Sequence, residues 1–466
     1  MKMDIKNYPL LRVNYNRLEV NNNKYIFHVP SSSVFELSKS SDEVLSKLEN
    51  NEELTLEDKE ILKEFMSLNL VGNQFREKPV KVEKFPAKAL VLNVTSGCNL
   101  SCTYCYKEDL TSLKNSGNMS FEMAKDAINL FFKESPDLKN YSITFFGGEP
   151  LSNLPLIKQI IEYANEFFGS KSLNIGYAMT TNGTLLTKDI IEYMYKNRVD
   201  LTISIDGPKA LHDKTRVFEN GKGTYQSVVK NLSTLLSVYK DRIVPARVTL
   251  TRGVADVLEI WNHLKNELGF KEIGFAPVTS GENEFFNLTS QEQAKVFDEF
   301  KILGEHYIEN AIKGKLNGFS NIHRTIMDIH EGRKKRLPCG AGVGLLSVSY
   351  KGDIDLCHRF TGSDFQSFGS VEEGLDKKSL SKFLENRANE KDSDCQSCRA
   401  RYLCAGGCYH ENYIKNKSPE IKGHQYCDTL REWIDFVTVA YIKIRENNPD
   451  FFDKFLTNKG VENETF

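Results

Sequence analysis

The most specific chemistry in this 466-residue sequence comes from three cysteines in one short segment. Cys98, Cys102 and Cys105 are spaced C-x3-C-x2-C, so a loop that carries them can offer three thiolates to one metal centre. A cubane iron–sulfur cluster takes four ligands, and three thiolates leave one iron open to a small molecule. The alternative is a structural zinc site, which favours four ligands in paired C-x2-C units. No fourth cysteine or histidine follows within this segment, so the spacing favours the cluster.

A second group of cysteines gathers toward the C-terminus and predicts a further metal-binding region. Its members are Cys339, Cys357, Cys395, Cys398, Cys404, Cys408 and Cys427. A pair of zinc ribbons is the alternative here, because C-x2-C units suit zinc. Disulfides are less expected, since the first residues show no apolar signal-peptide core and therefore predict a reducing, cytoplasmic compartment.

The elements expected around the first cysteines place them at the end of a buried strand. The apolar run from Ala89 to Thr95 has the pattern of such a strand, with apolar residues on both faces. Cys98 follows three residues later. The C-terminal ends of parallel strands are where barrel folds place their active sites, so an open iron here would be accessible.

The next apolar runs, 141–146, 174–180 and 201–205, end in turns that a bound ligand would need. The residues at or just after these ends are Gly147, Gly148, Glu149, Thr181, Asn182, Ser204 and Asp206. The two glycines let the backbone approach a ligand closely. Each turn alone would be ordinary, and Asn-Gly alone predicts a hairpin. Helical patterns between the runs instead favour parallel crossovers and an α/β fold.

Together, the cysteine triplet and the strand-end turns resemble the radical S-adenosylmethionine (radical SAM) enzymes. The resemblance implies an open, partial (β/α)6 barrel with later strands near 244–250 and 272–278. It implies a 4Fe–4S cluster on the first three cysteines, whose free iron is chelated by SAM; one-electron reduction then gives methionine and a 5′-deoxyadenosyl radical. The implied SAM pocket is Gly147, Gly148, Glu149, Thr181, Asn182, Ser204, Asp206 and Arg216. For Arg216, a solvated surface position is the alternative.

The downstream spacing resembles the SPASM extension of peptide maturases, which usually carries two auxiliary 4Fe–4S clusters. By this resemblance an outer cluster is held by Cys395, Cys398, Cys404 and Cys427, and an inner cluster by Cys339, Cys357 and Cys408. Seven thiolates cannot fill eight positions. The inner cluster therefore has either a non-cysteine ligand or an open iron, which could bind a substrate cysteine as thiolate.

Shorter segments, 27–30, 35–37 and 357–364, resemble the maturases of quinohemoprotein amine dehydrogenase and their thioether-forming ranthipeptide relatives. Those enzymes link cysteine to side-chain carbons of aspartate or glutamate. Sulfatase-maturing relatives place an acidic residue directly after the cysteine that matches Cys357, where it can act as a base, and here this residue is His358. His358 is a catalytic candidate, although a hydrogen-bond donor beside the cluster or a satisfied core residue is favoured.

The first 75 residues form a block of their own. Apolar residues recur at every second position on both sides of 21–23, which predicts a hairpin with its turn there. Two helices follow, one around 44–48 and one that begins at Thr55, where Asp58 has the spacing of a capping box. The block resembles a winged-helix-like element that binds a leader peptide by adding it as a strand. A DNA-binding winged helix is the alternative, but the acidic start of the second helix, 57–60, suits phosphates poorly.

The chain is expected to divide into six stretches: a peptide-recognition domain (1–75), a charged linker (76–88), the barrel (89–300), a bridge (301–335), the SPASM domain (336–430) and a C-terminal helix (431–466). Lys plus Arg number 61 against 63 for Asp plus Glu, a balance that predicts no nucleic-acid partner and no anionic membrane surface. No apolar run approaches the roughly 18 residues that a spanning helix needs.

These features predict a radical SAM enzyme that modifies a ribosomally made precursor peptide. The favoured reaction is a thioether crosslink between cysteine sulfur and a side-chain or alpha carbon of an acceptor, preferably Asp or Glu. The resemblance also implies a flavodoxin- or ferredoxin-type electron donor. Formylglycine formation of the sulfatase type and carbon–carbon crosslinking are the enzyme alternatives. An iron–sulfur DNA-binding regulator and an electron-transfer module are the alternatives from other classes, but neither explains the strand-end turns.

Overall fold

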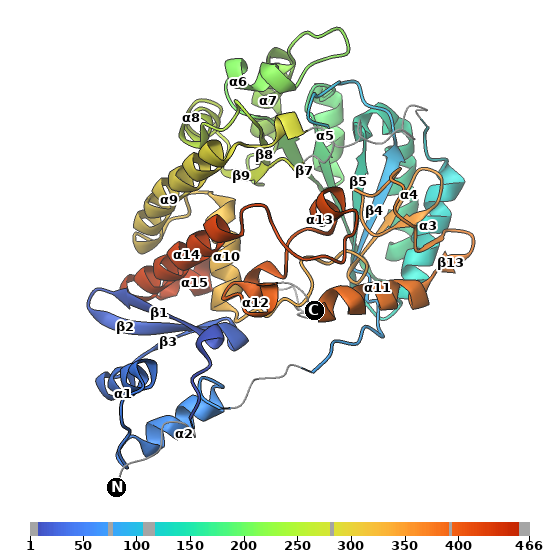
Figure 1. The fold of residues 1–466 in the computed structure, drawn as a ribbon. Helices are drawn as coiled ribbons and strands as arrows, with labels where there is room; N and C mark the ends of the chain where they lie inside the picture. Colours follow the sequence, from blue (N-terminus) through green and yellow to red (C-terminus); the bar gives the residue numbers. More distant parts are fainter. Residues whose placement is uncertain (1–7, 73–77, 106–116, 280–283, 391–393, 456–466) are drawn as a thin grey trace.

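The computed structural model describes residues 8–72, 78–105, 117–279, 284–390 and 394–455. The ends of three expected stretches lie outside these ranges: residues 1–7 and 73–75 of the first block, 76–77 of the linker and 456–466 of the tail. Figure 1 shows a curved central sheet with helices around it and the N-terminal block at one end of the molecule.

Six parallel strands form the centre of the molecule and lie side by side in chain order. They are β4 (Ala89–Thr95), β5 (Asn140–Gly147), β6 (Asn174–Thr181), β7 (Val199–Ser204), β8 (Pro245–Leu250) and β9 (Glu272–Pro277). The helices that connect them are α3 (Phe121–Glu134), α4 (Leu154–Gly169), α5 (Lys188–Lys196), α6 (Lys209–Thr215), α7 (Tyr225–Val238) and α8 (Val257–Asn262). The α/β fold with a partial (β/α)6 barrel is thereby confirmed.

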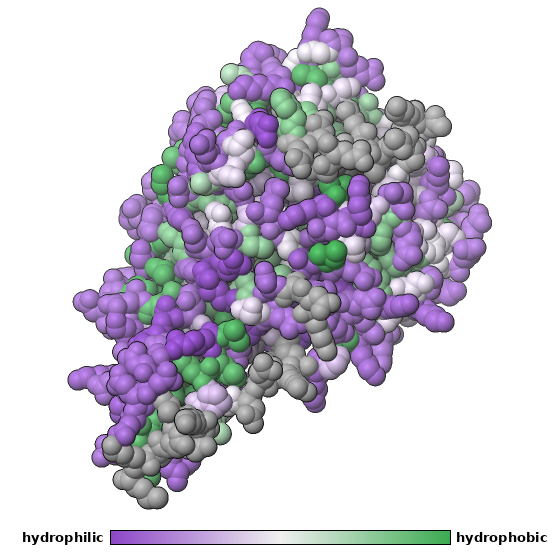
Figure 2. All heavy atoms as spheres, viewed as in Figure 1, coloured by the Kyte–Doolittle hydropathy of each residue, from purple (hydrophilic) through white to green (hydrophobic). Residues whose placement is uncertain are grey.

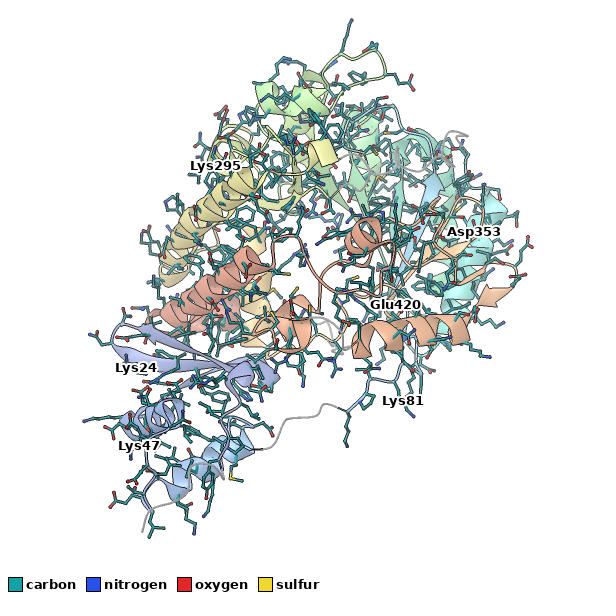
Figure 3. The ribbon with its side chains drawn as sticks, viewed as in Figure 1. Lys24, Lys47, Lys81, Lys295, Asp353 and Glu420 are labelled. Carbon is teal, nitrogen blue, oxygen red and sulfur yellow. The ribbon has the colours of Figure 1, made fainter. Side chains whose placement is uncertain are left out.

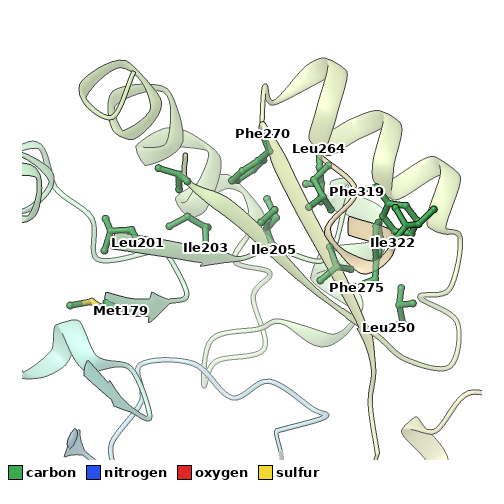
Figure 4. Packing of buried hydrophobic residues seen from close by; sticks show 14 of the residues in the cluster. Met179, Leu201, Ile203, Ile205, Leu250, Leu264, Phe270, Phe275, Phe319 and Ile322 are labelled. Carbon is green, nitrogen blue, oxygen red and sulfur yellow. The ribbon is translucent and has the colours of Figure 1, made fainter. Parts of the chain in front are cut away.

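Each barrel strand separates an apolar face from a more polar one, because side chains alternate along a strand. In β8, Ala246, Val248 and Leu250 are buried, whereas Arg247 and Thr249 on the other face are at least partly exposed. Figure 4 shows how the apolar faces of neighbouring strands pack together. Burying one Leu or Ile side chain contributes about 1.5–3 kcal/mol, so this core fixes which face lines the barrel interior.

The sheet continues past β4 into the cysteine-rich region, a connection that the sequence did not predict. β10 (Leu345–Val348) pairs parallel to β4, and β11 (Ile354–Asp355) pairs antiparallel to β10. Asn93 Nδ2 on β4 donates to Ser347 Oγ at 3.2 Å and to the Val348 carbonyl at 3.1 Å. The downstream cysteines are thus attached to the edge of the barrel sheet. A separate two-stranded ribbon follows, β12 (Gly369–Ser370) and β13 (Gly374–Leu375).

The N-terminal block is a three-stranded antiparallel sheet with two helices. The expected hairpin is β1 (Tyr15–Val20) and β2 (Asn23–His28), joined through Asn21 and Asn22, which have positive φ angles of 50° and 65°. The sequence did not predict β3 (Ser33–Glu36), which pairs with β2. Helix α1 (Lys39–Asn50) buries the expected apolar face, and α2 (Lys59–Ser67) begins four residues later than Thr55. Asp58 still accepts the Thr55 N–H at 2.8 Å, which is half of the expected capping box.

A layer of helices closes one side of the barrel. It contains α9 (Ser290–Ile312), α10 (Ser320–His330), α14 (Cys427–Asn447) and α15 (Asp450–Phe455). The expected tail helix is α14, where Trp433 is buried and stacks on Phe436 at 5.6 Å between ring centroids. The cysteine-rich region contains α11 (Lys377–Asn389), α12 (Arg401–Cys404) and α13 (Tyr409–Asn416).

The residues expected to form a linker pack against α11. The Val80 N–H donates to Asn389 Oδ1 at 2.8 Å, and the Val82 N–H donates to Glu385 Oε1 at 2.9 Å. Val82 is buried in the same apolar cluster as α11. On the face shown in Figure 2, hydrophilic residues dominate and hydrophobic residues form small separate patches. Among the described residues, none of the helices combines the length and the apolar character that crossing a bilayer requires.

Candidate active site

The first cysteine triplet lies on the loop that follows β4. Cys98 is exposed, and Cys102 and Cys105 are half-buried. The protein around Cys98 raises the pKa of its thiol to about 12 by desolvation, and neighbouring Glu149, Cys102 and Cys105 raise it as well. The three thiols therefore face a common space beside a carboxylate. A metal bound there would convert them to thiolates.

Two glycines hold this loop close to the end of β5. A Cβ added to Gly148 would lie 2.1 Å from the Gly97 carbonyl oxygen, and one added to Gly147 would lie 2.2 Å from the Thr95 carbonyl oxygen. The Gly148 N–H donates to that same Thr95 oxygen at 3.1 Å. The backbone at both glycines thus lies against the cysteine loop. The close approach to a ligand that the sequence predicts for them stays a prediction.

Glu149 is a buried carboxylate with three donors from the protein. Oε1 accepts from Thr181 Oγ1 at 2.7 Å and from the Leu151 N–H at 3.1 Å, while Oε2 accepts from the Asn182 N–H at 2.8 Å. Burial raises the pKa of Glu149, and these hydrogen bonds lower it. The carboxylate is fixed between the ends of β5 and β6, next to the cysteine loop.

Asn182 also ties its turn to the cysteine loop. Its Nδ2 donates to Asn99 Oδ1 at 2.9 Å, and Asn99 Nδ2 donates to Thr184 Oγ1 at 2.8 Å. The Asn-Gly pair leads from β6 to α5, so the hairpin alternative for this turn is wrong.

A buried network joins Tyr104, Asp206 and Arg216. The Tyr104 hydroxyl donates to Asp206 Oδ2 at 2.7 Å and accepts from Arg216 Nη1 at 2.5 Å. Burial raises the pKa of Asp206, whereas the Arg216 guanidinium lowers it. Arg216 is only 7% exposed, so the surface alternative for this residue is wrong. Its Nε is buried and has no hydrogen-bond partner among the described residues, which leaves one donor for a bound group. Ser204 lies half-buried at the end of β7.

The four cysteines expected to hold an outer cluster come together where α12 meets α14. Cys404 ends α12 and Cys427 begins α14. Burial raises the pKa of Cys404 to about 12, and nearby Cys395, Cys398 and Cys427 raise it as well.

The three cysteines expected to hold an inner cluster form a second set. Burial raises the pKa of Cys357 to about 12, with Cys408 and Cys339 as neighbouring charges that act in the same direction. The Tyr409 hydroxyl is buried, and within the described ranges it has no hydrogen-bond partner. After burial, these thiols are among the groups that raise the pKa of Tyr409. Tyr409 therefore brings a buried hydroxyl that has no hydrogen-bond partner among the described residues to the neighbourhood of this set.

The described residues contain no group of three or more His, Cys, Asp or Glu side chains arranged around the position of a single metal ion. A 4Fe–4S cluster binds each of its cysteine ligands on a different iron, so it does not require such an arrangement.

Cationic and aromatic side chains lie between the inner set and the barrel interior. The His358 ring lies 4.1 Å from the Phe146 ring, between centroids, at the end of β5. Arg359 Nη1 lies 3.7 Å from Cys408 Sγ. Arg247 of β8 is exposed to solvent, but desolvation by the surrounding protein lowers its pKa, and nearby Arg324 and Arg359 lower it as well.

Roles for Tyr104, Arg247 and Tyr409 were not predicted from the sequence. The signal for Arg247 was available, because it is the one charged residue within the run 245–250. Tyr104 stands directly before Cys105 and Tyr409 directly after Cys408, so both also carry a local signal. The partners of Tyr104, Asp206 and Arg216, come from distant parts of the chain.

Comparison with known proteins agrees with this geometry. Residues 92–265 match the model of the radical SAM superfamily. An uncharacterized protein of Methanocaldococcus jannaschii is 31% identical over 278 residues, which cover 59% of this chain and 86% of that protein. The cysteine-type anaerobic sulfatase-maturating enzyme of Clostridium perfringens is 25% identical and covers 78% of this chain and 99% of its own length. Among solved structures, Streptococcus suis SuiB bound to precursor peptide SuiA has a TM-score of 0.51 at 16% identity and covers 90% of this chain and 99% of its own.

The matched region contains the cysteine triplet, the strand-end turns and the Tyr104 network. Enzymes of this group bind SAM and a 4Fe–4S cluster, and three thiols beside a fixed carboxylate and an arginine with a spare donor fit both. The cysteine-rich C-terminal region fits the auxiliary clusters of SPASM relatives. The chain belongs to the radical SAM superfamily.

Proposed function

We propose that this protein modifies a ribosomally made precursor peptide, preferably by thioether crosslinks between cysteine sulfur and a side-chain or alpha carbon of an acceptor residue. The observation that carries the proposal is the position of the inner thiol set. Arg359 contacts Cys408 and acts electrostatically on Arg247 in the barrel interior. In this proposal the inner thiol set holds a metal site that borders the space in which a substrate would meet the radical.

Four residues of the chain hold the cofactor in this proposal. When bound, SAM and its cluster supply a 5′-deoxyadenosyl radical. Glu149 presents a fixed carboxylate to the ammonium group of SAM. Arg216 presents its Nε donor to the SAM carboxylate, and Tyr104 and Asp206 hold the guanidinium in place. Positioning of this kind restricts which substrate hydrogen the radical can reach.

The proposed reaction forms one C–S bond and breaks one C–H and one S–H bond. The radical takes a hydrogen atom from the acceptor carbon, the thiol loses its hydrogen as a proton, and one electron leaves the product. The two downstream cysteine sets would hold the acceptor for that electron. Three thiols in the inner set leave one iron position for a substrate cysteine, with the Tyr409 hydroxyl as the competing ligand.

The barrel interior favours an acidic acceptor residue. Desolvation lowers the pKa of Arg247, and nearby Arg324 and Arg359 lower it as well, whereas Glu411 and Asp206 raise it. Arg359 already pairs with Glu411 at 3.3 Å. A guanidinium binds a carboxylate through two parallel hydrogen bonds, so a substrate carboxylate at Arg247 would relieve its repulsion with Arg324. Asp or Glu is therefore the preferred acceptor.

A sulfatase-type reaction is the second candidate, because the Clostridium perfringens relative is a sulfatase-maturating enzyme. A sulfatase-type reaction would need a base directly after Cys357. His358 occupies this place, and its ring lies against Phe146. This contact supports a positioning role for His358 over proton transfer.

We further propose that the N-terminal block binds the leader of the peptide along β3. In the ladder of β2 and β3, the Leu37 N–H donates to the Lys24 carbonyl at 2.8 Å. Because donors alternate along a strand, the N–H groups of Val34 and Glu36 point away from β2. No described strand pairs with that edge. SuiB, whose solved structure holds a precursor peptide, supports this kind of partner. A flavodoxin- or ferredoxin-type protein would supply the electron.

The test is turnover with a candidate precursor peptide that carries a cysteine and an acidic acceptor residue. The reconstituted protein is reduced with dithionite and given SAM and this peptide. Formation of 5′-deoxyadenosine, loss of one free thiol and a product lighter by two hydrogens per crosslink support the proposal. A product aldehyde would support the sulfatase-type reaction instead, and a failure to form 5′-deoxyadenosine would overturn both.

A further inference from the structure

Arg387 on α11 is a fully buried cation at the centre of the cysteine-rich region. Its exposed fraction is 0%. Nη1 donates to the carbonyls of Glu420 at 3.1 Å and Ile421 at 2.6 Å. In Figure 3, Glu420 is labelled beside α11. Nη2 donates to three further carbonyls, Ala405 at 3.5 Å, Gly406 at 2.8 Å and Gly407 at 2.9 Å.

The three carbonyls around Nη2 belong to the segment between Cys404 and Cys408. Ala405, Gly406 and Gly407 have positive φ angles of 52°, 78° and 81°, so the segment is wound left-handed. This winding turns consecutive carbonyls toward the guanidinium. A Cβ added to Gly407 would lie 2.6 Å from His424 Nε2, so the turn is closely packed on its other side. Arg387 therefore holds the turn that sets the spacing between an outer and an inner cysteine.

No carboxylate among the described residues forms an ion pair with Arg387. An unpaired buried charge is costly, because carbonyl dipoles replace only part of the lost hydration. Cys395 and Cys404 of the outer set are close enough to act on the charge of Arg387. The thiol of Cys339 in the inner set is in turn close enough for the charge of Arg387 to act on its pKa. Tyr409 and the Glu390 carboxylate also act on the charge of Arg387. The thiols of both sets, in their metal-bound form, would add further negative charge around the guanidinium.

We propose that Arg387 is a positioning residue that serves as the shared counter-charge of both auxiliary clusters and raises their reduction potentials. This inference rests on the cluster assignment of the proposed function. A 4Fe–4S cluster with four thiolates carries two negative charges when oxidised, and the electron it accepts adds a third. A nearby fixed cation stabilises the reduced form more than the oxidised form. It would therefore help the clusters to accept the electron that leaves the product.

The test measures reduction potentials in the full-length chain with Cys98, Cys102 and Cys105 changed to Ala, so that only the downstream clusters contribute. Arg387→Gln removes the charge, and Arg387→Lys keeps it with fewer donors. Arg242→Gln is the matched control, because Arg242 pairs with Asp200 on the barrel, far along the chain from the downstream cysteines. Iron content is measured beside a dithionite titration followed by electron paramagnetic resonance.

We expect Arg387→Gln to shift the reduction equilibrium at least tenfold toward the oxidised clusters, which is 59 mV for a one-electron couple. Arg387→Lys should show less than half of that shift, and Arg242→Gln none. Full iron with an unchanged potential in Arg387→Gln would overturn the inference while leaving the cluster assignment intact. Loss of iron from both Arg387 variants would also overturn it, because the residue would then be structural only. If the background chain binds no iron, the assignment itself fails, and the inference fails with it.

Discussion

At the scale of single residues, the candidate site depends on buried polar groups that are matched to charges from other elements. Glu149 and Arg216 lie on either side of the cysteine loop with their charges fixed by neighbours. Their roles require a metal centre on the first triplet. Two predictions concern side chains of the barrel, one for the cysteine triplet and one for Arg247.

Changing Cys98, Cys102 and Cys105 together to Ala should abolish 5′-deoxyadenosine formation. The three thiols hold one cubane, so iron should fall by about four per chain, while the absorbance of the downstream clusters persists. Iron analysis and chromatography of the reaction with SAM check this. Continued SAM cleavage in the triple variant would show that the radical cluster lies elsewhere.

Changing Arg247 to Met should weaken crosslinking of an acidic acceptor. The variant keeps most of the side-chain volume but loses the guanidinium, and a charge-assisted bond of this kind contributes about 1.5–3 kcal/mol, or roughly 10- to 150-fold in kcat/KM. SAM cleavage without peptide should be unaffected. Arg242→Met is the control on the barrel. An equal loss with a peptide whose acceptor is Asn would contradict carboxylate recognition.

At the scale of elements, a short helix and an edge strand make predictions of their own, one for the stability of the protein and one for peptide binding. Helix α6 holds His212 in its neutral form. The Asp206 N–H donates to His212 Nδ1 at 3.2 Å, and His212 Nε2 lies 2.9 Å from Thr224 Oγ1. Burial lowers the pKa of His212 to about 3, and the nearby Arg216 lowers it too.

The stability of the protein should therefore fall in mild acid. Between a pKa near 6.5 in the unfolded chain and about 3 in the folded chain, the unfolded state binds the extra proton. The free energy of unfolding should drop by about 1 kcal/mol from pH 6.5 to pH 5.5 through this residue alone. Urea unfolding at both values checks this, with His212→Asn as the comparison. The asparagine variant should lose the part of the pH dependence that comes from His212. If the free energy of unfolding changes with pH to the same extent in both proteins, the role of His212 is contradicted.

The edge of β3 makes a separate prediction for the leader. Glu36→Pro removes an N–H that points away from β2, so the ladder within the block should survive. Binding of the precursor peptide should weaken by about 1 kcal/mol, roughly fivefold, because one intermolecular hydrogen bond is lost. Calorimetry measures this, and uncoupled SAM cleavage serves as the control. Unchanged affinity would argue against strand addition at this edge.

The six barrel strands could be predicted from the sequence because their signals are local: alternation along each strand and turn residues at each end. Strand β10 could not, because its four residues are ordered by pairing with β4. Asn93 and Ser347, which join the two strands, are 254 residues apart. The features of the candidate site divide in the same way, into local ones and ones that depend on the folded chain. The strand-end residues were identified from the sequence, whereas the burial of Arg216 and the ring of carbonyls around Arg387 depend on segments that meet only in the folded chain.

At the scale of the whole molecule, the N-terminal block and the outer cysteine set share a boundary. Arg401 Nη1 donates to the Val13 carbonyl at 2.7 Å, and Asn16 Nδ2 donates to Asp435 Oδ1 at 2.8 Å. Arg401 begins α12, and Asp435 lies on α14. The proposed leader-binding sheet therefore rests on the helices that carry Cys404 and Cys427, as Figure 1 shows.

Separation of the metal sites predicts separable activities. Replacing Cys408 by Ala should stop crosslinking but preserve 5′-deoxyadenosine formation, because the first cysteine set is untouched. Peptide binding should change the spectrum of the downstream clusters only if the peptide carries its cysteine. Mass spectrometry and absorbance spectra check both points. A Cys-to-Ser peptide with the same spectral change, or a Cys408→Ala product still lighter by two hydrogens, would leave the inner cluster as an electron acceptor only.

The pairing of β10 with β4 has a consequence for the synthesis of the chain. A ribosome that adds about 5–20 residues per second needs roughly 13–50 s to travel from β4 to β10, the 254 residues that separate Asn93 from Ser347. During that interval one edge of the nascent barrel is open, and such an edge readily pairs with other chains. The first three cysteines have then left the ribosome, while the last ones have not been made. We therefore expect that protection of that edge by a chaperone, together with timely delivery of iron, would raise the yield of active protein.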